Sequence, residues 1–216
     1  MTASESTLEA LFGQVLKSKM GEPLPFYGPV EERAGLPCAE DAARFSPLDL
    51  ERMKNDLIEY AEERGIILVE GPSGELTPYR HARPWRVSRD MAVVGLELRI
   101  GGFLGPEYRF VYDGGELRYS ETGYEMAPAR DFITFIDGKG GSRLERILWD
   151  NGVFEWRRHY WEAVLDGTQW SLLVLFDNGY AYVSGGSNGF PESFDSVVAQ
   201  LSRLVVGEFL CPGTSA

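Results

Sequence analysis

The sequence predicts a single α+β domain in which two N-terminal helices and one C-terminal helix pack on an antiparallel, hairpin-rich sheet. Apolar residues recur at helical spacing near both ends of the chain and at two-residue spacing between them. A chain of 216 residues with 44% hydrophobic composition is long enough to bury one substantial core. We therefore expect one domain over residues 1–216, with a helical part at 1–65, the sheet at 66–184, and a turn and helix at 185–210.

The first helix is expected over about residues 6–19. Ser6 and Glu9 have the spacing of a capping box, in which two side chains reciprocally bond free backbone N–H groups. The apolar residues that follow share one helical stripe, made of Leu8, Leu11, Phe12, Val15 and Leu16.

A second helix is expected over about residues 47–64. Ser46 supplies a capping hydroxyl, and Pro47 suits the first helical turn, where a backbone N–H would have no partner in any case. Between the two helices, residues 22–43 carry several prolines and glycines and are expected to be irregular. No role is assigned to that segment.

Residues 66–184 are expected to form the sheet, because the apolar spacing changes there from helical to two-residue. Long strands are predicted at residues 143–149 and 153–164, and the glycine-rich residues 138–142 before them are predicted to be a flexible connection. Turn sequences with Asp-Gly or Asn-Gly at the tip predict tight hairpins at residues 112–115, 149–152 and 176–179.

The last helix is expected to begin near Pro191 or Ser193 and to lie across the sheet. Its apolar stripe, typical of a helix with one buried face, contains Phe194, Val197, Val198, Leu201, Leu204 and Val205. The glycine-rich residues 185–189 before it are interpreted as a turn in which Ser187 and Asn188 cap backbone groups.

Residues 185–189 also match the G-x-S-x-G string of a nucleophile elbow. In enzymes with that elbow a histidine follows the serine along the chain, but His81 and His159, the two histidines here, both precede Ser187. A hydrolase that uses Ser187 and His159 is therefore the less favoured hypothesis. The histidines also lack the spacing of a zinc-binding helix, so neither a metal nor another cofactor is expected.

The charge distribution points to a protein partner. A net charge of -12 disfavours nucleic acid and anionic membranes, since both are bound through clustered Lys and Arg. From residue 160 onward the acidic residues are Glu162, Asp166, Asp177, Glu192, Asp195 and Glu208, against one basic residue, Arg203. All of these acidic residues except Glu208 form a candidate face for a basic partner, and the alternative is a solvated surface.

A second candidate surface lies in residues 156–161, where aromatic and basic residues alternate imperfectly. Large aromatic side chains are usually buried, which favours a second packed layer. The alternative is an exposed patch made of Trp156, Arg158 and Tyr160 that recognises a partner.

Cys38 and Cys211 are the only cysteines, so at most one internal disulfide could form, and two free thiols are the favoured state. No run of about 18 apolar residues and no signal-peptide pattern occurs. The protein is expected to be soluble and cytoplasmic, and its oligomeric state is not predicted.

The C-terminal pattern consists of a strand led by Trp170, the run Gly185–Pro191 and then Phe194. It resembles a unit at the end of uncharacterised bacterial proteins, in which a tryptophan-led strand and a G-x-N-x-x-P-x-x-F turn precede a last helix. Some proteins of that kind look like immunity proteins that accompany toxins. The resemblance implies a role in binding and blocking a cognate toxin, with no catalytic residues to carry over.

These observations favour a non-enzymatic, acidic protein-binding module, most concretely a cytoplasmic immunity protein that neutralises a toxin. Two alternatives remain open. One is a small-molecule sensor with a pocket between sheet and helices, and the other is the hydrolase that uses Ser187.

Overall fold

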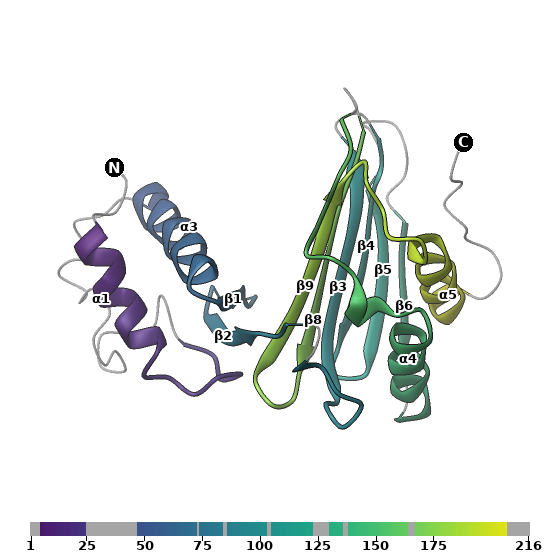
Figure 1. Ribbon diagram of the computed structural model, residues 1–216, viewed down its shortest axis with the longest axis horizontal. Helices are drawn as coiled ribbons and strands as arrows, with labels where there is room; N and C mark the ends of the chain where they lie inside the picture. Colours follow the sequence, from purple (N-terminus) through teal and green to yellow (C-terminus); the bar gives the residue numbers. More distant parts are fainter. Residues whose placement is uncertain are drawn as a thin grey trace. The chain divides into compact units, whose positions relative to one another are not determined.

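The computed structural model describes residues 5–24, 47–72, 74–83, 86–102, 105–122, 130–135, 138–163 and 167–206. Four α-helices and a mixed sheet of nine strands in these residues give the predicted α+β architecture (Figure 1). The chain divides into two compact units. The smaller is Met1–His81 with Asn178–Ala181, and the larger is Ala82–Asp177 with Tyr182–Ala216. That the whole chain is one domain remains a prediction.

The smaller unit contains the two predicted N-terminal helices, α1 (Glu5–Val15) and α3 (Pro47–Glu63). Their apolar stripes meet in one core, whose buried residues are Leu11, Phe12, Val15, Met53, Leu57, Ala61, Ile66, Leu68 and Leu76. Leu16, which was expected on the first stripe, is exposed because α1 ends at Val15. The periodicity therefore predicted both helices and placed only the end of the first one too late.

A hairpin completes the smaller unit. Strand β1 (Ile66–Glu70) pairs antiparallel with β2 (Leu76–His81). The end of β2 also pairs in parallel with Tyr180 and Ala181, the first residues of β9 (Tyr180–Ser187). The sheet is therefore mixed, whereas the hairpin turns alone predicted a purely antiparallel one.

The larger unit is built on an antiparallel meander followed by a returning hairpin. Strands β3 (Val93–Gly102), β4 (Glu107–Asp113), β5 (Glu116–Thr122) and β6 (Arg130–Phe135) pair antiparallel in sequence. Strand β8 (Thr168–Phe176) pairs antiparallel with β3, and β9 lies beside β8. The short β7 (His159–Trp161) pairs in parallel with β9.

Two of the three predicted hairpin turns are confirmed. Gly114 and Gly115 have φ values of 55° and 89° between β4 and β5, and Gly179 has a φ of 78° between β8 and β9. The third sequence, residues 149–152, is not a hairpin, because it ends a helix and leads into a turn of 3-10 helix, η3 (Val153–Glu155). Gly152 has a φ of 61°, so an Asn-Gly pair supplies the same left-handed backbone at a helix end.

The prediction of a strand at residues 143–149 was wrong, since these residues belong to helix α4 (Gly138–Asp150). Leu144, Ile147 and Leu148 are buried, and their spacing of three and four residues places them on one helical face. The predicted strand at residues 153–164 was also mostly wrong, because among its described residues, 153–163, β7 is the only strand. The glycine-rich residues 138–142, expected as a flexible connection, form the start of α4.

The C-terminal helix α5 (Phe194–Val206) lies where it was predicted. Figure 1 shows α4 and α5 on the same side of the larger unit's sheet. Strand residues that face these helices are buried, among them Leu98, Phe110, Tyr119, Leu172 and Val174. We call the opposite side the open face, because no helix of the larger unit's described residues covers it (Figure 1).

Candidate binding surface

Trp156, one residue of the predicted aromatic and basic patch, lies in the core. Its indole N–H donates to Ser193 Oγ at 3.0 Å, and its ring packs edge-on against Trp170 at a centroid distance of 5.7 Å. The Trp170 indole N–H donates to the carbonyl of Gly189 at 2.8 Å, and its ring lies 4.8 Å from that of Phe194. These rings form a buried aromatic layer that joins β8 to the start of α5.

Arg158 and Tyr160 are half-buried beside that layer. The Tyr160 hydroxyl accepts a hydrogen bond from the Arg157 N–H at 3.0 Å, and its ring lies 5.9 Å from Trp170. The Arg158 carbonyl accepts from Gly185 N–H at 3.0 Å, so the backbone here is tied to β9. The sequence left open whether residues 156–161 form a packed layer or an exposed patch, and Trp156 is buried in a packed layer.

The next residue along β7, Trp161, is 76% exposed and was not singled out from the sequence. Successive residues of a strand point to opposite faces, so the packing of Tyr160 on Trp170 turns Trp161 outward. The alternation of exposed and half-buried residues along β7 is the sequence pattern that could have predicted the exposure of Trp161. Because β7 has only three residues, this alternation cannot be recognised within a stretch that is rich in aromatic residues.

Three of the predicted acidic residues lie in two segments that contact each other beyond the end of β9. Glu162 follows β7, and its N–H donates to the Ser187 carbonyl at 3.0 Å at the end of β9. Glu192 and Asp195 follow within the turn and first helical turn that β9 leads into. All three side chains are exposed, and we call Glu162, Glu192 and Asp195, with Trp161 and Phe190, the acidic end.

The two segments of the acidic end are packed closely. A side chain added at Gly189 would come within 2.9 Å of the Trp161 backbone nitrogen, so the turn lies directly on β7. Phe190 is 42% exposed, and its ring lies 4.9 Å from that of Phe194. The two segments of the acidic end are therefore held together at Gly189 and Trp161, with Phe190 packed on the Trp170 side and Trp161 turned to the opposite side.

Asp177, another of the predicted acidic residues, does not join this group. Asp177 lies at the turn between β8 and β9, where its N–H and Oδ1 both bond to the backbone of Ala92, at 3.1 and 3.2 Å. The length of β8 separates Asp177 from the Thr168 end of the hairpin, where Glu162 lies, by roughly 27 Å at about 3.4 Å per residue. Asp166 lies outside the described residues, as do Cys38 and Cys211.

Ser187 belongs to the end of β9, so the strand continues beyond residue 184 into the run that was interpreted as a turn. Its Oγ accepts a hydrogen bond from the Gln169 side-chain amide at 2.7 Å. Asn188 follows with a φ of 60°, and its N–H donates to the Thr168 carbonyl at 2.9 Å. These contacts join the start of β8 to the end of β9, far from the hairpin turn, so Ser187 and Asn188 have a structural role.

Tyr182 ties β9 to the segment before β7. Its hydroxyl donates to the Trp156 carbonyl at 2.8 Å, and Ser184 Oγ donates to the Arg157 carbonyl at 2.7 Å. Burial, and secondarily the nearby Tyr160 hydroxyl, raises the pKa of Tyr182 well above its usual range. The phenol therefore stays protonated at neutral pH and acts as a donor that positions β7.

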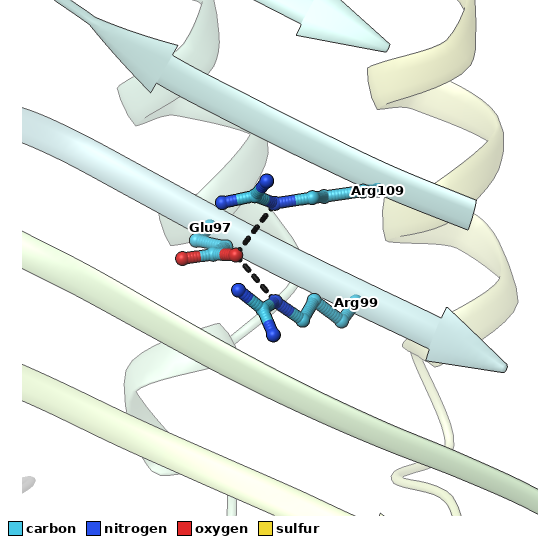
Figure 2. A network of polar contacts seen from close by, with 3 residues as sticks. All are labelled: Glu97, Arg99 and Arg109. Carbon is cyan, nitrogen blue, oxygen red and sulfur yellow. Dashed lines mark hydrogen bonds and ion pairs between the residues drawn. The ribbon is translucent and has the colours of Figure 1, made fainter. Parts of the chain in front are cut away.

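A charged network lies on the open face. Arg99 and Arg109 are directly opposite each other on β3 and β4, an arrangement of like charges that is unfavourable by itself. Figure 2 shows Glu97 between the two guanidinium groups, and its Oε1 accepts from the Nε–H of both arginines. Because both arginines are about half exposed, such pairs contribute only about 0–1 kcal/mol each. We assign the network to the stability of the sheet.

No group of three or more His, Cys, Asp or Glu side chains that could hold a metal ion occurs in the residues that the structure describes. None of the helices there has the length and apolar character needed to cross a membrane. Neither any protein-family model nor any curated protein sequence matches the chain. The candidate surface therefore rests on its own geometry.

Proposed function

We propose that this protein is a non-enzymatic protein-binding module that uses the acidic end to bind a basic surface of a partner. In its most concrete form it is a cytoplasmic immunity protein that binds and neutralises a cognate bacterial toxin. The observation that carries the proposal is that two segments in contact at Gly189 and Trp161 carry the exposed carboxylates Glu162, Glu192 and Asp195 and two exposed aromatic rings.

The composition of the acidic end suits such a role. Protein interfaces draw most of their binding energy from a few anchoring residues, among which aromatic side chains are enriched. Trp161 and Phe190 can supply this apolar contact without a costly rearrangement, because the segments that carry them are fixed by hydrogen bonds and ring packing. The exposed carboxylates of the same segments would attract a basic partner and orient it before contact.

The charge of the whole chain supports the same partner. At a net charge of -12, a basic protein is drawn from a distance, and association is faster at low than at high ionic strength. The C-terminal pattern led by Trp170, with its resemblance to immunity-like proteins, is what makes a toxin the most concrete partner. Within that pattern, the buried Trp170 donates a hydrogen bond to the Gly189 carbonyl, which links the tryptophan-led strand to the turn before the last helix.

The experiment coexpresses this protein with the product of each adjacent gene and measures complex formation and protection of the cells from toxicity. The test variant is Glu162→Lys/Glu192→Lys, and the matched control is Glu9→Lys/Glu59→Lys, at exposed positions in the smaller unit. Both pairs change the net charge equally. We expect the test variant to weaken binding by at least about tenfold, which is about 1.4 kcal/mol, and to lose protection.

The control variant should bind with nearly the affinity of the wild type. Equal weakening by both variants would show a general charge effect and would remove the role assigned to the acidic end. If no adjacent gene product forms a complex or is toxic, the immunity function itself is wrong.

A further inference from the structure

Strand β6 is the last strand in the order β9-β8-β3-β4-β5-β6 of the larger unit's sheet. It pairs with β5 over six residues without a bulge, and Thr134 Oγ1 donates to the Val205 carbonyl of α5 at 2.8 Å. Among the described strands, none pairs with its outer edge. Alternate residues of such a strand point their N–H and C=O groups away from the sheet. Because β6 is fixed by β5 and α5, its outer edge presents an ordered row of backbone donors and acceptors.

The side chains of β6 leave this edge unprotected. Ile133 and Phe135 lie on the open face and are 49% and 80% exposed. Natural sheets usually protect their edges with lysine, proline, a bulge or a very short strand. Within Arg130–Phe135 there is no lysine, proline or bulge, and the charged residues are confined to the first two positions.

The outer edge of β6 specifies what it can bind. Its backbone groups pair only with another extended polypeptide, and Ile133 and Phe135 favour apolar side chains at alternate positions of that segment. Asp131 shares their face, so a basic side chain opposite it completes the match. A second copy of this chain is a poor occupant, because each copy carries a net charge of -12 and the two would repel.

We propose that the outer edge of β6 binds an extended, basic segment of another protein, which adds to the sheet as an extra strand. Main-chain hydrogen bonds supply affinity in such strand addition, and alternate side chains supply specificity. The edge lies at the opposite end of the strand order from β9, where β7 and the acidic end are found. The proposal therefore goes beyond the function proposed above, and its test does not depend on that function.

The test uses a labelled, end-capped peptide, Val-Thr-Val-Thr-Lys-Thr, designed to pair antiparallel with β6. Two further peptides have identical side chains but carry N-methyl groups on one or the other set of alternate amides, which blocks hydrogen bonding along one edge. Fluorescence anisotropy gives affinity up to about 1 mM peptide, and hydrogen exchange of residues 130–135 reports pairing at β6. We expect the parent peptide to slow exchange there, and one of the two methylated peptides to bind at least about tenfold more weakly.

The variant Ile133→Lys/Phe135→Lys should lose the peptide and keep the wild-type melting temperature, since both side chains are exposed. The matched control is Leu48→Lys/Val94→Lys, which changes two other exposed apolar residues and should still bind. Unchanged exchange at residues 130–135, equal binding of all three peptides, or equal loss in both variants would overturn the proposal. The proposal would also be overturned if the protein alone formed a dimer and Ile133→Lys/Phe135→Lys converted it to a monomer, because a second copy would then occupy the outer edge of β6.

Discussion

Replacing Gly186 with alanine tests whether the glycine-rich run serves the aromatic core. The added Cβ would lie 2.5 Å from the Gly189 carbonyl oxygen and closer still to Trp170 Nε1, two atoms that are joined by a hydrogen bond of 2.8 Å. Neither atom can move away easily, because one is backbone and the other belongs to a buried ring packed against Trp156 and Phe194. The substitution should therefore strain the join between β8 and α5.

The expected loss can be worked from these contacts. Overpacking of a close-packed core costs about 1–3 kcal/mol, and loss of the Trp170 to Gly189 hydrogen bond costs about 1 kcal/mol more. Alanine restricts the unfolded chain and returns about 0.5 kcal/mol. We expect Gly186→Ala to lower the free energy of unfolding by about 1.5–3.5 kcal/mol.

The assay is urea unfolding followed by tryptophan fluorescence, with the midpoint and slope fitted separately. Gly105→Ala is the matched control in the same unit, since its added Cβ would meet nothing within 4 Å. The control should change stability by less than about 0.5 kcal/mol. A Gly186→Ala protein as stable as the wild type, or two variants with equal losses, would refute the reasoning.

Three further predictions concern other parts of the molecule. Gly13→Ala in α1, where the added Cβ meets nothing within 4 Å, should raise the thermal stability of the smaller unit by about 0.5–1 kcal/mol, and a lower melting temperature would contradict this. The buried Lys54 ammonium bonds Glu51 at 2.7 Å and Glu70 at 2.6 Å, so Glu51→Gln/Glu70→Gln should cost about 3 kcal/mol in urea unfolding by neutralising two carboxylates that bond this buried charge. Lys54→Met, which removes the charge, should cost less, and the reverse order would contradict the explanation. Burial raises the pKa of Tyr182 above its usual 10.0, so its contribution to stability is complete below about pH 10 and is lost as the pH rises further, because the unfolded phenol ionises first. Tyr182→Phe should make the urea midpoint fall less steeply as the pH rises above about 10. If the midpoint falls as steeply as in the wild type, ionisation of Tyr182 is not the cause of the loss.

Much of the candidate surface was visible in the sequence as a set of residue types, but its grouping was not. Glu162, Glu192 and Asp195 were identified from acidity alone, and a parallel pairing between β7 and β9 places Glu162 beside the segment that carries the other two. Asp177 has the same chemistry and lies at the other end of β8. Charge counting cannot separate these cases, because the distance between two residues depends on strand length and direction.

The aromatic residues show the same limit. Trp156 is 5% exposed and Trp161 is 76% exposed, although both lie in one short run of similar composition. The difference comes from η3 and β7, two very short elements that turn one ring toward Ser193 and the other to solvent. The exposure of Ile133 and Phe135 on β6 likewise follows from the position of that strand at the end of the order.

Short-range patterns were sufficient for α1, α3, α5 and the glycine turns at residues 114–115 and 179, because apolar spacing and positive φ act within a few residues. They were insufficient for α4. Its residues Leu144, Ile147 and Leu148 fit a helical face, but the Asn-Gly pair that follows suits a hairpin and a helix end equally well. Packing resolved the choice, because a helix there covers the same side of the sheet as α5 and buries the apolar stripe, and that need exists only once the strands have assembled.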